Sequence, residues 1–78
     1  PSRLARLLLR LLDQHKRETK HGTRINIKLS QQEIANLIGA TREMTSTVLN
    51  SFKKDGLIKV ESKYIYIIDR KKLSYMAR

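Results

Sequence analysis

The spacing of apolar residues at the start of the chain predicts an amphipathic helix. From Ser2 to about Arg17, leucines recur every three or four residues. The main apolar stripe consists of Leu4, Leu7, Leu8 and Leu11. Three further apolar residues widen it, namely Ala5, Leu9 and Leu12. We expect this surface to fill a small core, with contact to a neighbouring domain or subunit as the alternative. The arginines on another face, which we expect to be solvated, are Arg3, Arg6 and Arg10.

An extended region follows the first helix. Residues 18–24 are polar and predict a loop, whereas residues 25–29 alternate between apolar and polar and predict a short strand. This strand leads directly into the next helical segment.

Residues 31–54 predict two helices joined by a tight turn. Ser30 and Glu33 have the spacing of a capping box, in which each side chain accepts a hydrogen bond from the other residue's amide. Gly39 follows the apolar stripe, at the position where glycine most easily adopts a left-handed backbone. The expected apolar face of the first of these helices consists of Ile34, Ala35, Leu37 and Ile38.

The second of these helices has one apolar side and one polar side. Thr41 is expected to cap it, with Glu43 in the first turn complementing the helix dipole. The expected buried stripe is Thr45, Val48, Leu49 and Phe52, and the helix ends at about Lys54. The opposite side offers Arg42, Glu43, Ser46, Thr47 and Asn50. Because reading a DNA major groove requires such a polar face, the pattern predicts a DNA-binding helix-turn-helix.

Two β-rich runs near the C-terminus predict a hairpin. Residues 57–60 and 64–68 are separated by only three residues, a spacing typical of a β-hairpin. Asp69 is expected to cap a last helical turn, and residues 74–78 are expected to fray.

The order of these elements predicts a fold that is mainly α with a small β hairpin, a winged helix-turn-helix. Residues 1–78 form one domain, in which the helix-turn-helix spans about residues 31–54 and the wing about residues 57–68. The helix over about residues 42–54 would be the recognition helix in the major groove.

Charge and composition narrow the possible functions. The chain has 17 Lys and Arg against 7 Asp and Glu, a net charge of +10, which favours a polyanionic partner. It has no cysteine, so it has no disulfide and no thiolate metal site. His15 and His21 lack a ligand cluster at metal spacing and are expected at the surface. The carboxylates are scattered and no nucleophile is placed beside a base, which argues against an enzyme.

From about Ser2 to Leu73, the chain resembles the C-terminal domain of bacterial transcription regulators of the cyclic-AMP receptor and fumarate–nitrate regulator (Crp/Fnr) family. The resemblance is strongest in LSQQEIANLIGATRE, followed by GLIKV and a basic hairpin. Thr45 departs from the pattern, which usually has an aliphatic β-branched residue there, and we expect its hydroxyl to bond a carbonyl one turn back. The stretch INIKLSQQEIANLIGATRE is also similar to nitrogen-control regulators of cyanobacteria and algal plastids.

The resemblance implies base contacts from the start of the recognition helix. Arg42 can donate two hydrogen bonds to guanine O6 and N7, and Glu43 can accept one from cytosine N4. Many relatives carry a second arginine four residues after the glutamate, where this chain has Thr47. Threonine can offer a methyl group to thymine or one hydroxyl bond. Ser46 is small and lets the helix approach the bases closely.

The resemblance also implies phosphate contacts by Ser30, Thr41 and Lys63, and we assign Asn50 on the polar face to the same group. Hydroxyls beside free amides at a helix start suit an anion, and lysine suits it as a point charge. Such contacts orient a protein on DNA without reading its sequence.

By this resemblance, the chain is the DNA-binding output domain of a dimeric transcription regulator. Double-stranded DNA is the expected partner, with homodimerisation in the full-length protein, RNA polymerase as a further partner, and no membrane. The chain begins with Pro rather than Met, so we expect a longer protein. We expect no cofactor in this segment, because the effector site would lie in an N-terminal domain. The expected location is the cytoplasm, at the bacterial nucleoid, or the stroma for a plastid type.

Two other functions remain open at this point. Winged helices also serve as protein-interaction or assembly modules, and the apolar surplus on the first helix favours that alternative. The arginines among these leucines would also suit a helix lying on a membrane surface, which we rank last.

Overall fold

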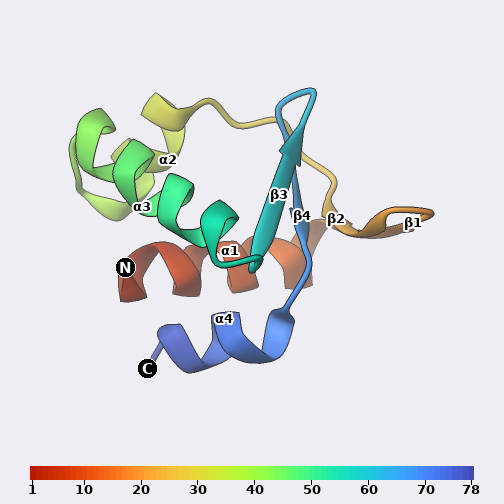
Figure 1. Cartoon of the computed structure of the whole chain (residues 1–78). Helices are drawn as coiled ribbons and strands as arrows, with labels where there is room; N and C mark the ends of the chain where they lie inside the picture. The colour runs from red at the N-terminus through yellow and green to blue at the C-terminus, as the bar shows by residue number, and fades with distance from the viewer.

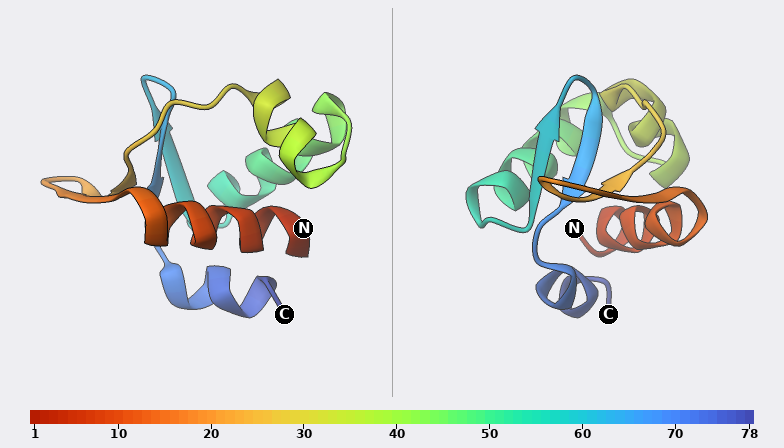
Figure 2. Two further views of the ribbon diagram at one scale, coloured as in Figure 1. Left: turned by 180° about the vertical axis from the view of Figure 1, so that it is seen from behind. Right: turned by 90° about the vertical axis from the view of Figure 1, so that its right-hand side faces the viewer.

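The computed structural model describes every residue from Pro1 to Arg78, and Figure 1 shows the arrangement of its helices and strands. Its elements are α1 (Ser2–His15), β1 (Lys16–Thr19), β2 (Gly22–Ile25), α2 (Gln31–Ile38), α3 (Arg42–Lys54), β3 (Ile58–Glu61), β4 (Tyr64–Ile67) and α4 (Arg70–Met76). The strands form one antiparallel sheet in the order β1-β2-β4-β3. Helix α4 packs against α1, on the side away from α2 and α3 (Figure 2). The predicted winged helix-turn-helix is confirmed.

The predictions for the segment after α1 are wrong. The expected loop at residues 18–24 and the expected strand at residues 25–29 are replaced by a hairpin of β1 and β2, which begins directly after His15. Gly22, at a φ of 118°, permits its turn, and the Thr19 hydroxyl donates to the Gly22 carbonyl at 2.7 Å. Only Ile25 of these two strands is buried in the core. The polar residues can still form strands because strand pairing uses backbone hydrogen bonds.

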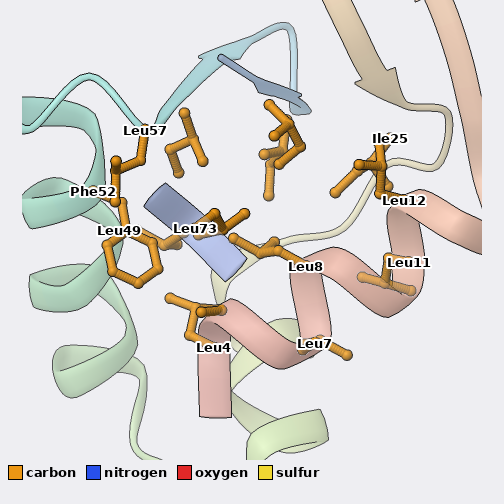
Figure 3. Close-up of a cluster of buried hydrophobic side chains, with 14 of the residues drawn as sticks. Leu4, Leu7, Leu8, Leu11, Leu12, Ile25, Leu49, Phe52, Leu57 and Leu73 are labelled. Carbon is orange, nitrogen blue, oxygen red and sulfur yellow. The ribbon is translucent and has the colours of Figure 1, made fainter. Parts of the chain in front are cut away.

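A single hydrophobic core joins all four helices and the sheet (Figure 3). Five of the six leucines of α1 are buried, namely Leu4, Leu7, Leu8, Leu11 and Leu12. Leu9 is half-buried and packs against the same cluster. The prediction that these leucines mainly fill the core is therefore confirmed. Leu37, in contrast, is 54% exposed, so its predicted place on the apolar face of α2 is wrong.

The three α1 arginines are exposed, which agrees with the predicted solvated face, but two of them also bind the ends of other helices. The Arg3 guanidinium donates to the Ile38 carbonyl at the end of α2, at 3.4 Å. Arg6 Nε donates to the Ala77 carbonyl at the end of α4, at 2.9 Å. Because the last carbonyls of a helix lack partners and carry partial negative charge, an arginine stabilises them.

A search of the four helices for a membrane-spanning segment finds none, because no helix has the length and the apolar character that a bilayer requires.

The chain remains ordered as a helix beyond the predicted last turn. Asp69 accepts a hydrogen bond from the Lys72 amide, which confirms the predicted cap. Residues 74–78 do not fray as expected, since α4 continues to Met76. The fully buried Leu73 and the bond from Arg6 to Ala77 hold this helix on α1.

Thr45 is the one buried polar residue, and its predicted hydrogen bond is absent. The residue is 1% exposed, and its hydroxyl oxygen has no hydrogen-bond partner. An unpaired buried hydroxyl costs free energy because water can no longer satisfy it. Threonine nevertheless has nearly the same size as valine, so it fills the space that the usual β-branched residue would fill.

We predict that Thr45→Val stabilises the fold, by about 1 kcal/mol, because the methyl group replaces an unsatisfied hydroxyl of the same size. This corresponds to a rise of about 4–8 °C in the melting temperature of a domain of this size. Thermal unfolding followed by circular dichroism would measure it, with Thr45→Ala as a control that leaves a cavity and destabilises. A lower melting temperature for Thr45→Val would show that the hydroxyl is satisfied in solution.

Candidate nucleic-acid interface

Helix α2 is fixed at both ends by local sequence signals. The Glu33 amide donates to Ser30 Oγ and the Ser30 amide donates to Glu33 Oε1, each at 3.1 Å, which is the predicted capping box. At the other end Gly39 takes the left-handed conformation, with a φ of 68°, and its amide donates to the Asn36 carbonyl. The turn then leads into α3 within two residues.

The capping box also sets the charge state of Glu33. Hydrogen bonds from the backbone and the hydroxyl of Ser30 lower the pKa of the Glu33 carboxyl, with a smaller contribution from the positive charge of Lys63. Glu33 is therefore more firmly ionised than an ordinary glutamate.

Helix α3 begins and packs as the sequence predicts. The Met44 amide donates to Thr41 Oγ1 at 3.1 Å, which confirms the predicted cap. Thr45, Leu49 and Phe52 are buried, while Val48 is half-buried at the margin of the core. The opposite side of the helix consequently faces solvent. Four of its five predicted polar residues are exposed and Ser46 is half-buried: Arg42, Glu43, Ser46, Thr47 and Asn50.

The wing is formed by β3 and β4, with Ile58 paired with Ile67 and Glu61 with Tyr64. Ser62 and Lys63 form its turn, and both have positive φ, 51° and 70°. A two-residue hairpin turn with two positive φ angles matches the twist of the strands. The turn places Lys63 at the exposed tip of the hairpin (Figure 1).

A cluster of cations and one aromatic ring joins the wing to the loop before α2. The Arg24 guanidinium lies 4.2 Å from the centre of the Tyr64 ring, and Lys28 Nζ lies 5.4 Å from it. Arg24 also donates to Asn26 Oδ1 at 2.8 Å. These contacts fix residues 26–29 beside the wing, although they lie outside the sheet.

A groove of about 490 Å³ separates the start of α2 and the length of α3 from the wing. We call it the helix–wing groove, and its eleven lining residues are Leu29, Ser30, Gln31, Gln32, Ile34, Arg42, Leu49, Lys53, Val60, Lys63 and Ile65. It brings together three residues that the sequence analysis selected separately, namely Ser30, Arg42 and Lys63. The others, Thr41, Glu43, Ser46, Thr47 and Asn50, lie outside it, on α3 and its cap.

The groove also includes polar residues that the sequence analysis missed, above all Lys53 and Gln31. Lys53 follows Arg42 by about three helical turns, so the two side chains leave α3 on the same side. That spacing was a usable signal for Lys53. No group of three histidine or acidic side chains lies close enough together to hold a metal ion.

The chain is a winged helix-turn-helix domain, because α2 and α3 are joined by a tight turn and the hairpin of β3 and β4 lies beside them as an exposed wing. The model of the Crp-like helix-turn-helix domain matches residues 2–76. The chain therefore belongs to this family of domains.

Individual relatives agree with this assignment. The chain is similar to the CRP-like cAMP-activated global transcriptional regulator of Mycobacterium tuberculosis. The two are 36% identical in an alignment that covers the whole of this chain and 35% of that protein. It is also similar to the cAMP-activated global transcriptional regulator Vfr of Pseudomonas aeruginosa. That alignment has 38% identity and covers 83% of this chain and 30% of that protein. The chain thus spans about a third of the length of the curated relatives it matches.

Two solved structures have the same fold over nearly all of the chain. The CO-dependent transcription factor CooA of Carboxydothermus hydrogenoformans superposes with a TM-score of 0.90 at 29% identity, over 99% of this chain and 36% of that one. A CRP-family transcriptional regulator of Thermus thermophilus gives a TM-score of 0.88 at 31% identity, over 97% of this chain and 38% of that one.

We predict that the capping box makes stability depend on acidic pH. Because the folded pKa of Glu33 lies below that of an ordinary glutamate, its contribution to stability is present above the ordinary glutamate pKa and is lost as the pH falls through the folded pKa. Urea denaturation from neutral to acidic pH should show this loss, and Glu33→Gln should remove it. An unchanged pH profile in Glu33→Gln would mean that the carboxylate does not act through its charge.

Proposed function

We propose that the chain binds double-stranded DNA sequence-specifically, as the output domain of a dimeric transcription regulator, with α3 in the major groove. The observation that carries this proposal is the exposed polar side of α3, held outward by the burial of its opposite side. A helix of 13 residues with an open N-terminal turn has the dimensions that a major groove accepts. The family of the chain and its net charge of +10 support the same function.

The N-terminal turn of α3 supplies the sequence-reading groups in this proposal. Arg42 and Glu43 are both exposed, so the guanidinium and the carboxylate are free to reach base edges. Arg42 would read guanine, and Glu43 would read cytosine. Ser46 follows one turn after Arg42, and its half-buried position lets the backbone of α3 come close to the bases.

Thr47 contributes an apolar contact rather than a donated hydrogen bond. Its hydroxyl donates to the Glu43 carbonyl within the helix at 2.9 Å, so that hydrogen is already used. The methyl group and one oxygen lone pair remain for the DNA. A thymine methyl group is the feature of the major groove that fits this side chain.

Four residues around the reading edge would contact phosphates. Ser30 and Thr41 accept cap hydrogen bonds through their oxygens, which leaves each hydroxyl hydrogen free to donate to a phosphate. Lys63 at the wing tip supplies a positive charge, and Asn50 supplies an amide from the exposed side of α3. These contacts would set the position of α3 on the duplex.

We propose that this domain acts within a longer protein, since the relatives that it matches are about three times as long. We propose a homodimer that places two copies of α3 on a two-fold operator, with RNA polymerase as a partner and any effector bound outside these residues. One relative is named as cAMP-activated and another as CO-dependent, so this fold occurs in regulators of more than one signal. The nitrogen-control type and the location at a nucleoid or in a plastid stroma stay predictions.

The structure removes the observation that favoured the alternative functions. The apolar surplus of α1 motivated both an assembly module and a membrane-surface helix, but these leucines lie in the core of the domain. The exposed side of α3 has no such internal use. DNA binding is therefore the function that these residues support best.

We predict that Arg42→Ala and Lys63→Ala weaken DNA binding in different ways. Arg42→Ala should reduce the free-energy difference between the preferred base pair and the others at one position by about 1–3 kcal/mol. The reason is that the two hydrogen bonds from the guanidinium to guanine are lost. Lys63→Ala should weaken all duplexes alike and make the salt dependence shallower by about one unit, because one phosphate contact is lost. Gel-shift competition over a range of salt concentrations, with Lys71→Ala on α4 as the control, would measure both. Equal displacement of the wild-type chain by every duplex would contradict sequence-specific binding.

We predict that Thr47→Arg changes the preferred sequence, whereas Thr47→Val preserves it. Arginine would introduce a second guanidinium that can donate two hydrogen bonds to a guanine. Valine retains the methyl group that contacts thymine. Selection of bound duplexes from a random pool should give a new guanine at one position for Thr47→Arg alone. If Thr47→Val shifts the selected sequence as much as Thr47→Arg, the hydroxyl rather than the methyl group is the reading element.

A further inference from the structure

The helix–wing groove combines an apolar floor with a cationic rim. Leu29, Ile34, Leu49 and Ile65 form the floor together with Val60, which projects from β3 and is 37% exposed. The basic residues of the rim are Arg42 and Lys53 on α3 and Lys63 on the wing. Positive charge thus lines both walls of an apolar channel that opens beside the reading edge of α3.

The rim cations have no salt bridge within the chain. The ion pairs of the structure join Lys59 to Glu61 and Arg70 to Asp13. Lys53 Nζ has only a long hydrogen bond to the neutral Asn50 Oδ1, at 3.5 Å. Lys63 acts partly on the Glu33 carboxylate, whose pKa it helps to lower. Lys53 therefore adds a positive charge that no salt bridge neutralises.

We propose that the helix–wing groove holds the sugar–phosphate backbone of one DNA strand, and that Lys53 binds a phosphate there, across the groove from Lys63. This inference rests on the proposed function and names a positioning residue that none of the motifs identified. Its occupant is a duplex strand because the groove is continuous with the exposed side of α3 through Arg42.

The chemistry of a nucleic-acid strand matches both parts of the groove. Phosphates carry a negative charge at regular intervals and suit cations on both walls. The deoxyribose between two phosphates presents C–H groups, and these can cover the exposed part of Val60 and the half-buried Leu29 without leaving a polar group unpaired. An acidic peptide would satisfy the cations but would need its own apolar side chain for the floor.

The test compares Lys53→Met with Lys71→Met, using the 78-residue chain and fluorescently labelled duplexes of unrelated sequence. Methionine keeps most of the aliphatic stem and removes the charge, and Lys71 is an exposed lysine on α4 outside the groove. Loss of one phosphate contact should make the slope of log affinity against log salt shallower by about 0.9. At about 0.1 M salt this equals a weakening of about eightfold, the same for every duplex. Lys71→Met should leave slope and affinity unchanged.

A second variant tests the apolar floor without changing charge. Val60→Trp fills the groove and should weaken binding to all duplexes while the salt slope falls, because the strand is displaced from Lys53 and Lys63. Val60→Thr, which keeps the size of the side chain, should bind within about twofold of wild type. Circular dichroism should confirm that each variant is folded.

The outcomes separate this inference from the proposed function. A wild-type chain that binds no duplex at low salt would contradict the proposed function itself. A wild-type chain that binds duplexes while Lys53→Met behaves like Lys71→Met would overturn the inference alone. Loss of binding to a polyglutamate peptide in Lys53→Met, with duplex binding unchanged, would also overturn it and would assign the groove to a protein partner.

Discussion

The burial of one side of α3 determines where every proposed functional group lies. Leu49 and Phe52 insert into the core between α1 and the sheet, and burying such side chains stabilises a fold by about 1.5–3 kcal/mol each. A domain of this size has only about 3–5 kcal/mol of core stability, so α3 cannot rotate about its axis without unfolding the domain. The opposite side is thereby held outward. Local hydrogen bonds at Thr41 and Ser30 then fix where each helix begins.

The helix-turn-helix and the wing could be predicted because their signals are local. A capping box, a left-handed glycine and an apolar stripe each act within about two helical turns, and the structure contains them at Ser30, Gly39 and along α3. The hairpin of the wing is likewise set by a short turn between β-rich runs. The exposed side of α3 follows from its buried side, so most of the candidate site could be derived from the sequence.

The remaining features depend on contacts between distant parts of the chain. β1 and β2 carry polar residues, and β2 finds its place through pairing with β4, where Ile25 lies opposite Ile65. Arg6 binds a carbonyl 71 residues away, which no periodicity reveals. The position of Lys53 in the helix–wing groove also required the wing to be placed beside α3.

The central claim is that the outward side of α3, with the wing beside it, is the surface that meets a duplex. The most direct measurement is a titration of the ¹⁵N-labelled chain with duplex DNA, followed by the backbone amide resonances. We expect the largest changes at the start and along the exposed side of α3 and at the wing turn, with α4 nearly unaffected. Changes confined to α1 and α4, with the resonances of Arg42, Glu43 and Lys63 constant, would contradict it.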